Sequence, residues 1–210
     1  MLYSSDEYRA YCSMRVGLTG GIGCGKSTAG KCFAELGWQR LDSDEIVREL
    51  LTTDPDLHSA LRSRWGGGAL LSEGGANRSF IAGKVFHDAA ELRWWEGQVL
   101  PRVRAAWQGA LAADPAADWL VEVPLLFEKD LSDSFDVTVC VESPESIQLE
   151  RLAAKGLDRE QSLARINNQM PVMDKVRRAN IVLSNPGSFD FLQRQVQRAS
   201  EMLRQLPPNS

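Results

Sequence analysis

The sequence reads Gly20-Gly21-Ile22-Gly23-Cys24-Gly25-Lys26-Ser27, followed by Thr28, directly after the apolar run Val16-Gly17-Leu18-Thr19. This stretch fills the pattern G-x-x-x-x-G-K-[ST], in which glycines let the backbone turn tightly and point successive N–H groups at phosphate oxygens. Lys26 supplies a positive charge for the outer phosphates, and the Ser27 hydroxyl is placed to ligate Mg²⁺. The pattern therefore predicts a site for a nucleoside triphosphate.

The residues on either side of this loop predict a strand before it and a helix after it. Apolar side chains recur on one face between Lys26 and Leu36, and Gly37 stands where a helix ends. A tight strand-to-helix turn without a ligand would explain one or two glycines. It would not require Lys26 followed by Ser27, so we interpret the loop as a nucleotide site.

Length and charge indicate one compact enzyme domain. A chain of 210 residues is long enough for one α/β core with inserted subdomains. A formal net charge of −4 argues against the broad basic face that nucleic-acid binding uses, so we expect no nucleic-acid partner. No stretch approaches the ~20 apolar residues of a membrane span, and the four cysteines show no C-x-x-C pair. We expect a cytoplasmic protein with reduced thiols and no membrane partner, as a monomer or weak homo-oligomer.

Short apolar runs alternate with helical periodicity along the chain, which is typical of a parallel sheet covered by helices on both faces. We predict strands near residues 14–19, 38–42, 118–123, 135–141 and 180–184. The gap between the second and third strands is too long for one crossover helix and predicts an inserted, mainly helical substrate subdomain. The final helix carries an apolar packing face of Phe189, Leu192, Val196, Ala199 and Leu203.

These spacings give the expected domain organisation. Residues 1–13 lack both a basic start and an apolar h-region, so we expect a loose extension rather than a secretory signal, with Met14 as an alternative start. We expect residues 14–206 to form a single nucleotide-binding domain. Its expected parts are a core (14–42, 118–148 and 176–206), an inserted substrate subdomain (43–117) and a basic helical segment (149–175) that can close over phosphates as a lid.

A second chemical feature, Asp42-Ser43-Asp44-Glu45, follows the second predicted strand, at the edge where open α/β sheets bind ligands. Phosphoryl transfer to a hydroxyl needs a carboxylate that accepts or positions the proton. The same residues also resemble a helix-capping box, and both interpretations can hold together. We predict that Asp44 is the general base and that Asp42 is mainly structural or associated with the metal.

Two further features can be interpreted either as functional or as ordinary solvent-exposed surface. Glu122 interrupts an apolar strand and is a candidate metal-associated carboxylate, although an edge-facing glutamate is an equal alternative. The helical stretch from Arg151 to Lys175 is rich in basic residues and contains Gln169. Such a segment can close over phosphates, or it can be a solvated charged face.

Several motifs together resemble the dephospho-CoA kinase family over most of residues 14–206. They are LTGGIGCGKST, LDSDEIVREL with Arg48, VPLLFE, ARINNQMPVMDK and RRANIVLSNPG. GGANR at residues 74–78 and Val85-Phe86 also resemble the substrate region of that family. The loop occurs in many kinases, whereas VPLLFE and the QMP string are far more particular to this one.

The resemblance implies a P-loop NTPase-type fold, with a helical insertion and a small lid. It implies transfer of the ATP γ-phosphate, with Mg²⁺, to the ribose 3′-hydroxyl of dephospho-CoA, giving CoA and ADP. Thr19 and Asp44 would face the acceptor, with Arg78 in the substrate region. Arg151, as a catalytic residue, and Arg165, as a substrate contact, would belong to the lid. Asn185 would lie beside the adenine, and ATP would be held by Gly21, Ile22, Gly23, Cys24, Gly25, Lys26, Ser27 and Thr28. The candidate metal residues are those named above from their positions, Ser27 and Glu122.

The chain departs from the family pattern in places that concern substrate affinity more than reaction type. Leu100-Pro101 stands where the family usually has His-Pro, and Lys155 stands for the second lid arginine. Lysine cannot form the bidentate fork of arginine. Asn180 also replaces a common aspartate.

Two other functions remain open at this point. Another small-metabolite kinase, similar to shikimate kinase, shares the loop and the Asp-x-Asp pair but does not explain VPLLFE or the QMP string. A catalytically impaired ATP-binding paralogue is the second alternative, because of the lid and histidine departures. A GTPase switch would need an N-K-x-D segment, which the sequence lacks.

Overall fold

The computed structural model describes residues 13–85 and 87–206, which divide into two compact units. The first unit holds the residues up to Asp42 and those from Asp114 onward, and the second holds Ser43–Ala113. The predicted extension, apart from its last residue, and the resemblance at Phe86 lie outside the described residues.

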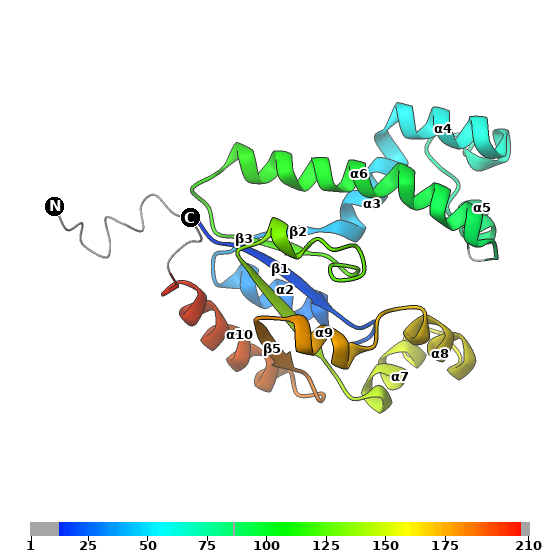
Figure 1. Cartoon of the computed structure of the whole chain (residues 1–210). Coiled ribbons are helices and arrows are strands. Elements are labelled where there is room, and N and C mark those ends of the chain that lie inside the picture. The colour runs from blue at the N-terminus through cyan, green and yellow to red at the C-terminus, as the bar shows by residue number, and fades with distance from the viewer. Residues whose placement is uncertain (1–12, 86, 207–210) are drawn as a thin grey trace. The chain divides into compact units, whose positions relative to one another are not determined.

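The first unit is built on a five-stranded parallel sheet in the order β2-β3-β1-β4-β5 (Figure 1). Each strand overlaps its predicted range, so the predicted α/β class with a parallel sheet is confirmed. The strands are β1 Arg15–Gly20, β2 Gln39–Asp42, β3 Trp119–Glu122, β4 Val137–Glu142 and β5 Ile181–Ser184. Because β1 is central, its carboxyl end delivers the glycine-rich loop to the middle of the sheet edge where ligands bind.

Helices cover both faces of this sheet. α2 (Lys26–Glu35) and α10 (Phe189–Leu203) pack side by side on one face, and α9 (Val172–Arg178) packs against β1 and β4 on the other (Figure 1). α7 (Glu145–Ala153) and α8 (Arg159–Asn167) pack against each other, and a short 3₁₀ turn, η2 (Ser132–Ser134), precedes β4. The three inner strands, β3, β1 and β4, are buried along most of their length, which explains their largely apolar sequences.

The main core lies between the sheet and the α2–α10 layer. Phe33 and Trp38 meet edge to face at 5.6 Å, and Trp38 Nε1 donates to Ser200 Oγ at 2.8 Å. Four of the five predicted α10 core residues are buried, namely Leu192, Val196, Ala199 and Leu203. Phe189 is 51% exposed, so that part of the prediction is wrong. It is the first residue of α10, and helical spacing alone does not show where the covering layer ends.

The second unit consists of helices. α3 (Ser43–Thr53), α4 (Pro55–Trp65), α5 (Arg78–Val85) and the long α6 (Ala89–Ala113) are joined by short connections, including a 3₁₀ turn, η1 (Gly67–Ala69). Trp65 and Trp94 meet edge to face at 4.8 Å, and Arg64 pairs with Glu91 at 2.7 Å. The tryptophan pair therefore helps to fasten α4 to α6.

Asp54 holds the start of α4. Its Oδ1 accepts the N–H groups of Asp56 and Leu57, both at 2.9 Å, and its Oδ2 accepts from Arg102 Nε at 3.1 Å. The hydrogen bond from Leu57 N–H is the largest cause that lowers the pKa of Asp54 below its ordinary value, and Arg102 adds to it.

Asp54→Ala should lower the free energy of unfolding by about 0.5–2 kcal/mol at pH 7, since a helix cap is lost. Because the pKa of Asp54 is depressed in the folded state, this contribution is present above the ordinary value of 3.8 and is lost as the pH falls below it. Urea unfolding at pH 7 and pH 3 measures both. Glu49→Ala, at an exposed carboxylate of the same unit, is the control, and an equal deficit at the two pH values would contradict the assignment.

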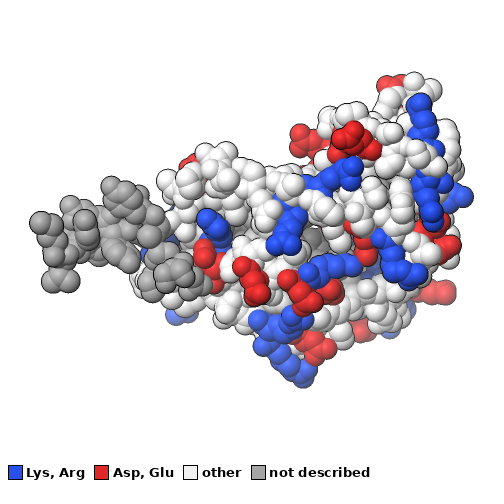
Figure 2. Space-filling model, turned by 45° about the horizontal axis from the view of Figure 1, so that its top comes forward, with Lys and Arg blue, Asp and Glu red and all other residues white. Residues whose placement is uncertain are grey.

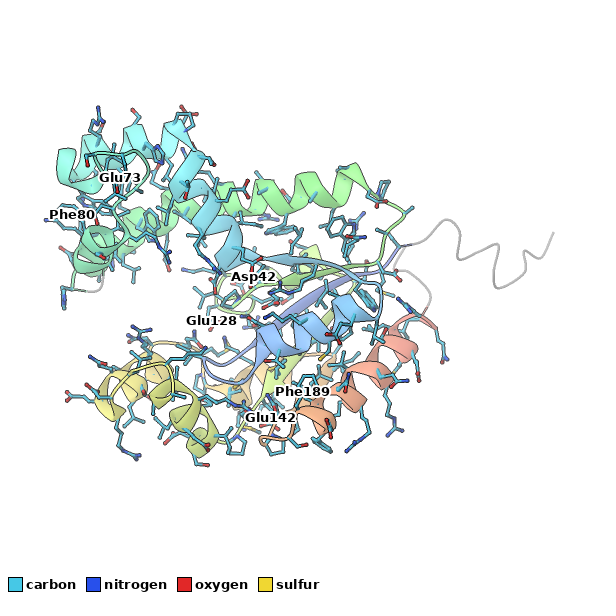
Figure 3. All side chains as sticks on the ribbon, turned by 180° about the vertical axis from the view of Figure 1, so that it is seen from behind. Asp42, Glu73, Phe80, Glu128, Glu142 and Phe189 are labelled. Carbon is cyan, nitrogen blue, oxygen red and sulfur yellow. The ribbon has the colours of Figure 1, made fainter. Side chains whose placement is uncertain are left out.

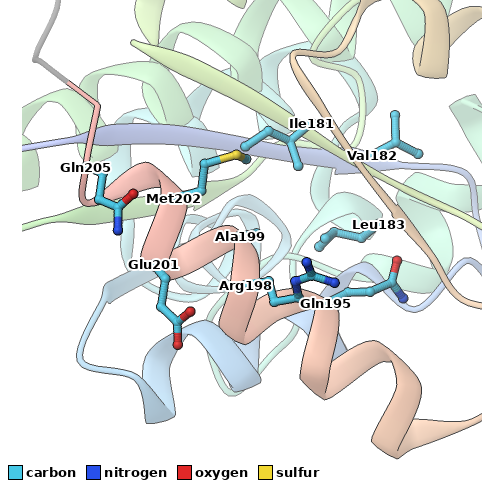
Figure 4. Close-up of a pocket in the computed structure, with 9 residues that line it drawn as sticks. All are labelled: Ile181, Val182, Leu183, Gln195, Arg198, Ala199, Glu201, Met202 and Gln205. Atoms are coloured by element: carbon cyan, nitrogen blue, oxygen red, sulfur yellow. The ribbon is translucent and has the colours of Figure 1, made fainter.

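The surface has a cavity outside the predicted site and, on one face, a mixed distribution of charge. A cavity of about 410 Å³ opens between β5 and α10, beside Val182 and Met202 (Figure 4), but none of the predicted site residues lines it. On the face seen in Figure 2, basic and acidic side chains are interspersed. Within the described ranges, no helix combines the length and the apolar character needed to cross a membrane.

Candidate active site

The glycine-rich loop has the backbone that its sequence predicts. Gly23 and Gly25 have φ of +77° and +91°, a region that residues with a Cβ rarely adopt. A Cβ on Gly25 would also collide with Asn185 Nδ2. α2 begins at Lys26, so the N–H groups of its first turn face the loop, where an anion is favoured.

Side chains from α7 and from the segments after β4 and β5 hold the loop by hydrogen bonds. Cys24 O accepts Asn185 Nδ2 at 2.8 Å and Ser143 Oγ at 3.2 Å. Arg151 Nη1 donates to Gly23 O at 3.0 Å and to Ser143 Oγ at 3.1 Å. The bonds to Gly23 O and Cys24 O use loop carbonyls, so they occupy none of the loop N–H groups.

A buried carboxylate stands at the start of α2. Glu122 ends β3 and is fully buried. Its Oε2 accepts Ser27 Oγ at 3.0 Å and lies 3.5 Å from Lys26 Nζ. Its Oε1 accepts Arg40 Nε at 2.6 Å. The structure thus brings the lysine and serine of the loop together with the acidic residue of the neighbouring strand, and the edge-facing alternative for Glu122 is wrong.

Arg40 is a site residue that the sequence reasoning missed. Its Nη2 donates to Asp42 Oδ2 at 2.9 Å, so it links both carboxylates. The sequence does contain a signal for this residue, in the spacing of Arg40 and Asp42 along one strand. Residues two apart share one face of a strand, and Asp42 is paired in register with Glu122 on the adjacent strand. Two carboxylates on one face call for a cation between them, because buried charges must be paired.

Gly30→Ala should destabilise the protein by about 1–3 kcal/mol, although alanine normally strengthens a helix. An added Cβ would collide with Glu122 Oε1 and lie 2.9 Å from Arg40 Nε. Thermal unfolding measures the loss, and calorimetry with MgATP shows whether the displaced carboxylate weakens nucleotide binding. Gly109→Ala is the matched control, since its Cβ would enter open space. A Gly30→Ala protein that unfolds later than wild type would contradict this packing.

The loop cysteine is not a reactive thiol. Burial is the main cause that raises the pKa of Cys24, and it raises the pKa of Cys140 to about 12. The three cysteines of the described chain, Cys24, Cys32 and Cys140, are free and buried. Cys24 therefore fills space in the loop, where Gln148 Nε2 lies 3.0 Å from its Sγ.

The predicted lid is divided into separate helices. The basic stretch from Arg151 to Lys175, predicted as one helical segment, contains the end of α7, all of α8 and the start of α9. Lys155 and Arg165 are exposed, while Lys175 is fully buried and pairs with Glu128 at 2.7 Å. For Lys175 a solvated face is therefore excluded. The sequence shows charge but not which positions point inward.

Thr19 and Asn185 are both buried and both engaged with the protein. Thr19 Oγ1 donates to Pro124 O at 3.3 Å, and Asn185 bonds the loop as described above. Their predicted contacts with acceptor ribose and adenine stay predictions.

The remaining acceptor residues belong to the second unit. Asp44 lies in the first turn of α3 and is exposed. It lines a cavity of about 390 Å³ together with Val47, Arg48, Leu51 and Arg78. An acidic residue and two arginines thus share one cavity, which suits a ligand that carries both hydroxyl and phosphate groups.

The chain is similar to known proteins over most of its length. The family model described as dephospho-CoA kinase matches residues 14–190. The dephospho-CoA kinase of Deinococcus radiodurans is 39% identical over 196 residues, covering 91% of this chain and 92% of that protein. The enzyme of that name from Gloeobacter violaceus is 38% identical over 185 residues, covering 88% and 90%. A crystal structure of a Thermus thermophilus protein matches with a TM-score of 0.78 and 32% identity, covering 91% and 98%. Because the model spans most of the sequence and the relatives are matched over nearly their whole length, the chain belongs to the dephospho-CoA kinase family.

Proposed function

We propose that this protein transfers the γ-phosphate of ATP to the ribose 3′-hydroxyl of dephospho-CoA and releases CoA and ADP. The observation that carries the proposal is the cluster of Lys26, Ser27 and Glu122 at the mouth of the glycine-rich loop. Membership of the family identifies the acceptor.

The loop and its cations would stabilise the transferred phosphoryl group. Loop N–H groups and Lys26 would hold the triphosphate, and fixed donors of this kind need no reorganisation as charge develops. Arg151 would add positive charge beside the loop, where its bonds to Gly23 O and Ser143 Oγ already fix its direction. Asn185, bonded to Cys24 O, would keep the loop in the shape that receives ATP.

The residues beside the loop fit Mg²⁺. Ser27 Oγ and Glu122 Oε2 lie 3.0 Å apart and provide the oxygen donors that this ion prefers. Among the residues that the structure describes, no group of three or more His, Cys, Asp and Glu side chains could hold a metal ion. Mg²⁺ commonly binds through one or two protein groups together with phosphate oxygens and water. Ser27 and Glu122 would hold it. When bound, Mg²⁺ would neutralise negative charge on the phosphates.

The second unit would bind the acceptor and supply the base. Asp44 would accept the proton of the 3′-hydroxyl as that oxygen forms its bond to the γ-phosphorus, while the bond from phosphorus to the bridging oxygen breaks and ADP leaves. Arg78, in the same cavity as Asp44, would bind acceptor phosphate groups. Thr19 and Arg165 would complete the acceptor contacts.

A coupled ADP-release assay tests the acceptor. ADP release with ATP and Mg²⁺ should depend on dephospho-CoA and should stay at background with shikimate or nucleoside monophosphates. Turnover with another acceptor alone would overturn the substrate assignment. ATP binding without turnover of any acceptor would instead identify an impaired paralogue, in which Leu100 or Lys155 has cost the activity.

A further inference from the structure

An ion pair with a fully buried lysine has no part in the chemistry described above. Lys175 of α9 is fully buried, and its Nζ lies 2.7 Å from Glu128 Oε1 and 2.8 Å from Pro124 O. Glu128 follows β3, toward the same end of the sheet as α7 and α8 (Figure 3). Its Oε2 is buried and accepts no hydrogen bond from any part of the chain that the structure describes.

An ion pair of this kind contributes little net free energy to the stability of a protein. Removing two charges from water costs several kcal/mol, and the attraction between them offsets that cost only when the remaining polar atoms are also satisfied. Here one carboxylate oxygen is not. What the pair does provide is a specific connection between the segment after β3 and α9, which are far apart in the chain.

Hydrogen bonds connect this pair to the glycine-rich loop. Met170 N–H donates to the same Oε1 of Glu128, at 3.1 Å. The neighbouring residue, Gln169, accepts the N–H of Ile22 through its Oε1 at 3.0 Å. The ion pair therefore holds Met170, and the residue beside Met170 holds the loop.

The same segment forms one wall of a cavity next to the loop. Gln169, Met170 and Pro171 line a space of about 320 Å³ together with Gly21 and Ile22. A shift of this segment would move the loop backbone and one wall of that space together. Small displacements matter at such a site, since a misplacement of about 1 Å can cost roughly 10²-fold in rate.

We propose that Glu128 and Lys175 are positioning residues, which hold Gln169 against Ile22 and so set the shape of the loop that receives the triphosphate. The proposal rests on the proposed function only for its turnover readout, because nucleotide binding can be measured without an acceptor. If the pair had a purely structural role, its removal would lower the thermal stability, and the effect of that removal would not depend on whether Gln169 is present.

A double-mutant cycle between Lys175 and Gln169 separates the two roles. MgATP affinity is measured by calorimetry, kcat and KM by ADP release, and stability by thermal unfolding, for Lys175→Met, Gln169→Ala and the double variant. Lys175→Met should weaken MgATP binding about tenfold, within the range for coupled neighbours. Gln169→Ala should have a similar effect, and adding Lys175→Met to it should change affinity by less than about twofold.

A control variant shows whether the loss is specific to the Lys175–Glu128 pair. Arg177→Met removes an exposed ion pair with Asp174 on the same helix and should leave affinity and turnover at wild-type values. If Lys175→Met does not fold, the double variant Glu128→Met, Lys175→Met replaces it, since it removes both charges together with the acceptor of the Met170 N–H. Folded variants with wild-type MgATP affinity, or losses that add fully across the cycle, would overturn the proposal. A wild-type protein that binds MgATP but does not phosphorylate dephospho-CoA would count against the proposed function alone.

Discussion

Replacement of Lys26 by methionine should lower kcat roughly 10²–10³-fold, the usual loss when one fixed electrostatic contact to the transition state is removed. Lys26 Nζ lies 3.5 Å from the buried carboxylate of Glu122, and its side chain is only 13% exposed. The ammonium group is therefore held in a site of low dielectric constant, where its charge counts for more than it would in water. The rate of ADP release at saturating ATP and dephospho-CoA measures this loss.

The stability of the Lys26→Met protein must be compared with that of a matched variant. Lys31 lies on the same helix and is exposed, so Lys31→Met should keep wild-type turnover. Thermal unfolding of both proteins shows whether the fold is preserved. Near-native kcat in a folded Lys26→Met protein would mean that this lysine does not contact the transferred phosphate.

Replacement of Asp44 by asparagine should lower kcat roughly 10²–10⁴-fold, because a general base contributes about that much to a proton transfer. Asp44 lies in the first turn of α3, where a carboxylate also favours the positive end of the helix. That local effect is limited to about 1 kcal/mol of stability. Kinetics and thermal unfolding together therefore separate a catalytic role from a structural one.

Glu49→Gln is the control for Asp44→Asn, because Glu49 is an exposed carboxylate of the same helix. It should keep wild-type kcat and KM. A folded Asp44→Asn protein with near-native turnover would remove Asp44 from the mechanism, and the proton would then have to leave by another route. A loss confined to KM would make it a binding residue instead.

The fold could be predicted because its signals are local. The loop pattern at residues 20–27 fixes a strand before it and a helix after it, and the alternation of apolar runs with helical periodicity indicates a parallel sheet. Strand positions follow from composition within a short window. The segment between β2 and β3 is too long for one crossover helix, so an inserted helical subdomain could be expected from its length.

Contacts between distant segments could not be predicted in the same way. The bond from Arg40 to Glu122 depends on the register of β2 against β3, which the sequence does not state. Lys175 looks like one more charge in a basic run, yet it is buried against Glu128 because α9 packs on the sheet. Periodicity shows which residues share a face, but not what covers that face, and Phe189 is exposed for that reason.

Transfer of label from [γ-³²P]ATP tests the central claim most directly. With dephospho-CoA and Mg²⁺, the wild-type protein should place the label on the 3′-position of CoA in a one-to-one ratio with ADP formed, and Lys26→Met should reduce both together. ADP formation that leaves the acceptor unlabelled, or label transfer that persists in Lys26→Met, would contradict phosphoryl transfer at this loop.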